Sequence, residues 1–208
     1  AEQSWQLVVH AAMTAYSWYL MGENGVGAEK WWNETVYLWV GPGTGPSNPA
    51  SPALDRLYII QLSIWIVTCF CHKFIDQKHK DYYVMYLHHI VTILLVVYSW
   101  SVSVRVGLMV LFIHDLSDIG VDLLKMANYA AYGFDELGFP LTEVTFVTAL
   151  LIWIWYRHVE FPMRILWSCW FVLFLSFKKY AAMLSLLCVS LCVYVCIFQH
   201  GGFRWRAA

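Results

Sequence analysis

Histidine and aspartate residues recur in two neighbouring apolar stretches between Lys80 and Tyr129 of this 208-residue chain. An imidazole beside a carboxylate can act as a general base, because the carboxylate orients the ring and stabilises the imidazolium that forms. An imidazole can also attack an acyl group as a nucleophile. The pattern therefore predicts acid–base or acyl-transfer chemistry. The first stretch carries His88, His89 and Thr92, and the second carries Arg105, His114, Asp115, Ser117, Asp118, Asp122 and Lys125.

The composition around these residues is that of a membrane protein. The chain is 60% hydrophobic and 13% charged, with a mean hydropathy of +0.56, whereas soluble domains contain roughly 25% charged residues. Ionisable side chains inside a bilayer usually face the protein interior and mark a functional site, because each costs about 3 kcal/mol to insert. A net charge of −1 gives no reason to expect a nucleic-acid partner.

We predict an all-α fold, a polytopic transmembrane helix bundle that forms a single domain over residues 1–208. About six apolar runs approach the length of roughly 20 residues that crosses a bilayer, and one more span is expected before residue 1. The distribution of Lys and Arg favours cytosolic termini. Glycine and proline predict a loop over 128–140, and Pro162 is expected to kink or end the fifth span. The spans cover residues 4–21, 56–75, 83–100, 105–125, 143–167 and 181–198.

Helical spacing predicts how the polar residues of the third and fourth spans face one another. His88 and Thr92 share one face, whereas His89 lies about 100° away around the helix. The connection near residues 101–104 is so short that the two spans must be antiparallel neighbours. His88 and His114 are each about a dozen residues from that turn, so we expect them at similar depth.

On the fourth span the polar residues form one stripe with a flank. His114, Asp118, Asp122 and Lys125 follow one another at steps of four, four and three residues, and Asp115 lies beside them. We expect Asp115 or Asp118 to orient His114 or its partner histidine, and Lys125 to pair with Asp122. Arg105 is expected to anchor its helix end at the membrane interface, with a snorkelling cation as the simpler reading.

A metal site is the competing interpretation of the same histidines. His and Asp are ordinary metal ligands, but the five remaining histidines make no HxxxH or HxxHH box with the central three. We therefore predict no metal. Separately, Asn33 begins an Asn-Glu-Thr tripeptide, a candidate glycosylation site if its loop is lumenal. The remaining histidines are His10, His72, His79, His158 and His200.

With these residues in view, the segment from Tyr86 to Tyr129 closely resembles the Lag1 motif of ceramide synthases, in the TRAM-LAG-CLN8 membrane superfamily. The spacing HHxxT, RxG, HDxSD and KxxNY is long and specific. The resemblance implies a sphingoid-base N-acyltransferase of the endoplasmic reticulum membrane, which takes acyl-CoA as co-substrate and needs no other cofactor. Its partners would be acyl-CoA, a long-chain sphingoid base, the lipid bilayer and a second copy in a homodimer.

Carried over residue by residue, the resemblance implies two groups of site residues. One histidine of the pair would attack the thioester or take a proton from the amine, and the sequence leaves both routes open. Other members of the superfamily look like lipid sensors or carriers, so a non-enzymatic function is the first alternative and a metal-dependent lipid hydroxylase the second. Acyl chain length would be set near residues 170–180. The catalytic residues would be His88, His89, His114, Asp115 and Asp118, with Thr92, Arg105, Ser117, Asp122 and Lys125 binding substrate.

Overall fold

The computed structural model describes residues 2–22, 28–39, 52–75, 82–102, 105–134 and 141–170. Every regular element in these ranges is helical, which confirms the predicted fold class. Helix η2 is a short 3-10 turn, and η4 is a π-helix that continues α6. The elements are α1 (Glu2–Met21), α2 (Ala28–Asn33), η2 (Thr35–Leu38), α3 (Pro52–Phe74), α4 (Tyr82–Val102), α5 (Val106–Phe134), α6 (Leu141–Ile154) and η4 (Trp155–Leu166).

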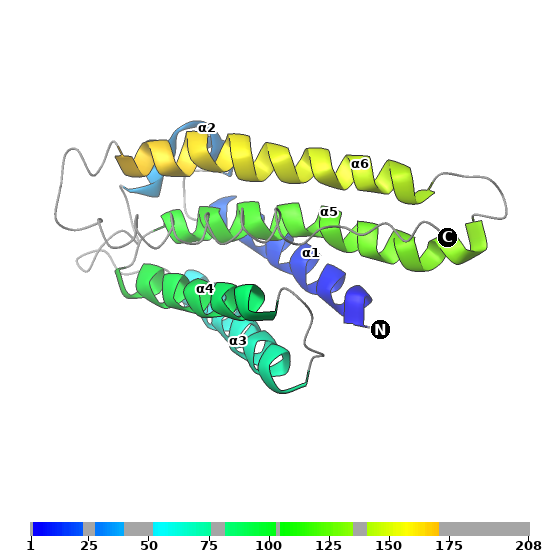
Figure 1. Ribbon diagram of the computed structural model, residues 1–208. Helices are drawn as coiled ribbons and strands as arrows, with labels where there is room; N and C mark the ends of the chain where they lie inside the picture. The colour runs from blue at the N-terminus through cyan, green and yellow to red at the C-terminus, as the bar shows by residue number, and fades with distance from the viewer. Residues whose placement is uncertain are drawn as a thin grey trace.

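Helix α5 is the centre of the bundle. It packs most extensively against α1 and α6, while α4 packs chiefly on α3. Figure 1 shows α6 running along α5 on one side, with α4 and α3 on the opposite side. The polar residues of α5 are therefore surrounded by helices from several distant parts of the chain.

Two helices have the length and apolar composition needed to cross a membrane. They are α3 and residues Tyr82–Ser101 of α4. Large apolar side chains on α3 point outward, with Ile66 and Val67 50% and 61% exposed, as expected of a surface in contact with lipid. The first five predicted spans correspond to α1, α3, α4, α5 and α6 with η4. The sixth, over 181–198, lies outside the described residues.

One predicted boundary was wrong. Helix α5 continues to Phe134 through the first half of the predicted loop, because one glycine costs a helix only about 1 kcal/mol and three alanines over 127–131 favour it. Of the two outcomes expected at Pro162, an end of the span is excluded, since the span continues to Leu166. The chain forms a π-helix from Trp155 to Leu166, and the amide of Trp167 bonds the carbonyl of Pro162.

Helices α4 and α5 approach each other closely where they join. A Cβ added to Gly107 would lie 1.9 Å from Ser99 Oγ and 2.4 Å from the Tyr58 hydroxyl. Tyr58 and Ser99 share a buried hydrogen bond of 3.0 Å. Only glycine leaves room for this bond, which gives the glycine of the RxG motif a packing role.

Arg105 does not extend to the surface as a snorkelling cation, and its anchoring at the membrane interface stays a prediction. Its side chain is fully buried, and its guanidinium lies 4.8 Å from the ring centre of Trp31. Arg164 of η4 stacks in the same way on Trp32, at 4.3 Å. Because desolvated cation–π contacts are worth about 2 kcal/mol, these two pairs fasten the α2 segment onto the end of the bundle.

Candidate active site

A cavity lies between α3, α4 and α5. Its walls combine polar and apolar side chains. His88, His114, Asp115 and Asp118 are polar, whereas Leu95, Val96, Val110 and Leu111 form an apolar part between them and Gly107. Its volume of about 50 Å³ holds a few water molecules, so a longer ligand enters only if lining side chains move. The lining consists of Tyr58, Trp65, His88, Thr92, Leu95, Val96, Ser99, Gly107, Val110, Leu111, His114, Asp115 and Asp118.

The structure separates the two adjacent histidines. His88 lines the cavity together with Thr92, whose hydroxyl donates to the His88 carbonyl at 2.9 Å. His89 is equally buried but is absent from the lining, and its ring lies 5.6 Å from Trp65 and 5.4 Å from His72. The predicted faces are thus confirmed, and His88 is the histidine of the pair that lines the cavity.

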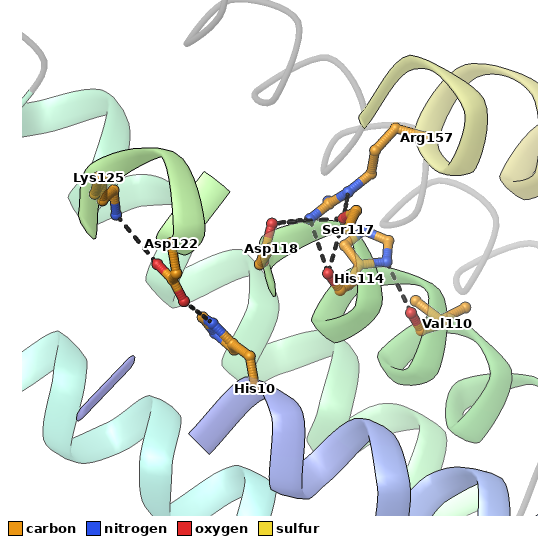
Figure 2. Close-up of polar contacts among 8 residues, drawn as sticks. All are labelled: His10, Val110, His114, Ser117, Asp118, Asp122, Lys125 and Arg157. Carbon is orange, nitrogen blue, oxygen red and sulfur yellow. Dashed lines mark hydrogen bonds and ion pairs between the residues drawn. The ribbon is translucent and has the colours of Figure 1, made fainter. Parts of the chain in front are cut away.

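His114 lines the same cavity, as its predicted depth required. Its Nδ1 donates to the Val110 carbonyl at 2.8 Å, a bond that Figure 2 shows. In a neutral ring this leaves Nε2 as the nitrogen that can accept a proton. Phe161 of η4 packs edge-on against the ring at 5.4 Å between centres. A backbone carbonyl, rather than the expected aspartate, therefore orients this imidazole.

Asp118 pairs with Arg157, a residue that the sequence analysis did not place in the site. Nη2 of Arg157 lies 2.8 Å from Asp118 Oδ1, and its Nε donates to Ser117 Oγ at 2.7 Å. Ser117 in turn donates to the His114 carbonyl at 2.8 Å. Arg157 is 4% exposed and belongs to η4. Its signal in the sequence was a lone cation in an apolar run, which usually has a buried partner.

Asp115 is held by a second residue that the sequence analysis missed. Gln61 of α3 donates to Asp115 Oδ2 at 2.6 Å, and both side chains are buried. The signal was again a polar residue within an apolar helix. Asp115 lines the cavity, whereas Gln61 stands behind it.

Asp122 lies beyond the cavity and joins α5 to α1. His10 Nδ1 bonds Asp122 Oδ2 at 2.7 Å, and Lys125 Nζ lies 3.6 Å from Oδ1, as Figure 2 shows. The predicted pair of Asp122 and Lys125 is confirmed. The sequence analysis did not place His10 with the central histidines, because its spacing does not predict a contact with α5.

The predicted residues thus fall into two groups. The cavity brings together two histidines and two aspartates, His88, His114, Asp115 and Asp118, with Thr92. Arg105, Ser117, Asp122 and Lys125 lie outside its lining, so their substrate contacts stay predictions. Asn33 is exposed at the end of α2, and its glycosylation also stays a prediction. In the part of the chain that is described, no three His, Cys, Asp or Glu side chains gather as metal ligands.

The fold and the cavity define an α-helical membrane protein with a buried histidine–aspartate site. Residues 1–200 match the TRAM/LAG1/CLN8 family, described as the TLC domain, and the chain belongs to this family. Among its relatives, "Ceramide synthase LOH1" of Arabidopsis thaliana is 30% identical over 73% of the chain and 48% of the relative. "Ceramide synthase 4" of Bos taurus is 29% identical over 82% and 40%. The chain therefore spans about half the length of these curated relatives.

Proposed function

We propose that this chain is the catalytic core of a ceramide synthase, which transfers a fatty acyl group from acyl-CoA to the amine of a sphingoid base. The observation that carries the proposal is the single cavity lined by His88, His114, Asp115 and Asp118, in a chain whose relatives bear the name ceramide synthase. We also place the protein in the endoplasmic reticulum membrane, where the Lag1-motif resemblance puts such enzymes.

The reaction forms a bond between the acyl carbon and the base nitrogen and breaks the thioester C–S bond. Coenzyme A leaves as the thiol, and the nitrogen must lose protons. His88 or His114 Nε2 takes a proton as general base, or His88 first attacks the thioester and becomes acylated. The two routes differ in order, because an acylated His88 releases coenzyme A before the base binds.

The defining experiment uses purified protein in detergent with a panel of acyl-CoAs and sphinganine, and it measures N-acyl product and free coenzyme A. His88→Gln should lower turnover by about 100- to 10,000-fold, the contribution of a positioned general base. The matched control is His158→Gln, since His158 packs on Trp153 at 4.9 Å and is not among the cavity-lining residues. Equal losses in both variants, or no product from intact wild type, would reject the proposal in favour of lipid binding.

We propose further that the reaction needs no metal. The chemistry of the lining fits this view, because imidazoles supply the base and the substrate thioester supplies the activated acyl group. Elemental analysis of active protein tests it, together with turnover after dialysis against a chelator. Stoichiometric iron or zinc whose removal abolishes turnover would replace this mechanism with a metal-dependent one.

A further inference from the structure

The three aspartates of α5 have partners of different charge. Asp118 pairs with the guanidinium of Arg157 at 2.8 Å, and Asp122 pairs with Lys125 and His10. Asp115 instead accepts a hydrogen bond from the neutral amide of Gln61 at 2.6 Å. Among the described residues, no Lys, Arg or His nitrogen lies within ion-pair distance of it.

Asp115 is also buried and faces the cavity. Its side chain is 4% exposed, and it lines the same space as His88 and His114. Burying a carboxylate beside a neutral donor alone is costly, because an amide supplies one hydrogen bond but no compensating charge. The neighbouring cations do not bond Asp115 directly, since Arg157 bonds Asp118 and His10 bonds Asp122.

We propose that Asp115 binds the protonated amine of the long-chain base, with Gln61 as the positioning residue that fixes its carboxylate. This assignment rests on the proposed acyl transfer and gives Asp115 a substrate-binding role instead of the orienting role expected from sequence. A long-chain ammonium brings the missing positive charge, and its apolar tail suits the apolar part of the lining. The ammonium then lies beside the two imidazoles that can deprotonate it.

The same contact favours release of the product. The ammonium loses a proton to an imidazole before its nitrogen attacks, and it loses a second one when the amide forms. The amide product carries no charge, so its ion pair with Asp115 no longer exists. Asp115 therefore discriminates between a cationic substrate and a neutral product.

Binding of radiolabelled octadecylamine to the protein in nanodiscs tests this inference without acyl transfer. Octadecanol competes as the neutral probe of equal length. Wild type should prefer the amine by about 10- to 100-fold, the factor that one charged hydrogen bond contributes. Asp115→Asn should reduce this preference to within about twofold. The control Glu160→Gln should keep it, because Glu160 pairs with Arg164 and is outside the cavity lining.

A second variant tests the same contact without changing Asp115. Gln61→Lys supplies an internal ammonium, which should occupy the carboxylate and abolish the preference even if Asp115→Asn fails to fold. An amine preference that survives in either folded variant, or that wild type lacks, would overturn the inference. Acyl transfer by wild type decides the proposed function separately: product formation with an unchanged sphinganine KM in Asp115→Asn rejects only the binding role of Asp115.

Discussion

Replacing Gly107 by alanine tests how closely α4 and α5 must approach at the end of the cavity where they join. The new Cβ would lie 1.9 Å from Ser99 Oγ, 2.4 Å from the Tyr58 hydroxyl and 2.8 Å from Ser99 Cβ. The Ser99 hydroxyl can turn away, but the Tyr58 oxygen is fixed to its ring and the Ser99 Cβ is fixed to its helix. The ring and the helices themselves must therefore shift.

The expected cost has three parts. Overpacking a tight contact costs about 1–3 kcal/mol, and losing the Tyr58–Ser99 hydrogen bond costs about 1 kcal/mol. The better helix propensity of alanine returns at most about 1 kcal/mol. We therefore expect Gly107→Ala to lower the free energy of unfolding by about 1–3 kcal/mol, measured by titrating the protein in mild detergent with a denaturing detergent.

Gly120→Ala is the matched control on the same helix. Its Cβ would meet Ala149 at 3.6 Å, an ordinary contact, so the variant should equal or exceed wild-type stability. Adding Ser99→Ala to Gly107→Ala should recover only part of the loss, because the Cβ contact remains. A Gly107→Ala protein as stable as Gly120→Ala would show that α4 and α5 do not pack as described, and the reasoning would fail.

Two further substitutions test the pairs that hold α5. Arg157→Gln leaves the Asp118 carboxylate without its cation, so we expect a loss of about 3 kcal/mol in unfolding free energy. Adding Asp118→Asn should restore part of it, and full additivity of the two losses would contradict the pair. His10→Phe removes a charged hydrogen bond to Asp122 and should lower the free energy of unfolding by about 2 kcal/mol. A thermal unfolding temperature equal to that of wild type would contradict this prediction and show that Lys125 is a sufficient partner for Asp122.

Relations within one helix, and between two helices joined by a short connection, could be predicted from the sequence. The shared face of His88 and Thr92, the pair of Asp122 and Lys125, and the common depth of His88 and His114 all follow from 3.6 residues per turn and one short connection. These are local consequences of helix geometry, and they required no knowledge of the partner helices.

Partners from distant helices could not be predicted in this way. Gln61, Arg157 and His10 lie on α3, η4 and α1, and each meets a different aspartate. Their contacts depend on how each helix is rotated about its axis. In a membrane bundle that rotation leaves little pattern, because lipid-facing and buried positions are both apolar. The π-helix of η4 could not be predicted either, since helix propensity alone does not indicate one.

The three aspartates of α5 bind the bundle together, and two of them, Asp115 and Asp118, also line the cavity. Each one reaches a different helix, and polar pairs of this kind stabilise packing where lipid removes the hydrophobic driving force between helices. Asp118 and Asp122 have charged partners and contribute mainly to this stability. Asp115 has a neutral partner, Gln61, so the bundle does not fully compensate its charge. A cationic substrate in the cavity can supply the missing positive charge. Loss of activity at any of the three is therefore informative only beside a measurement of folding.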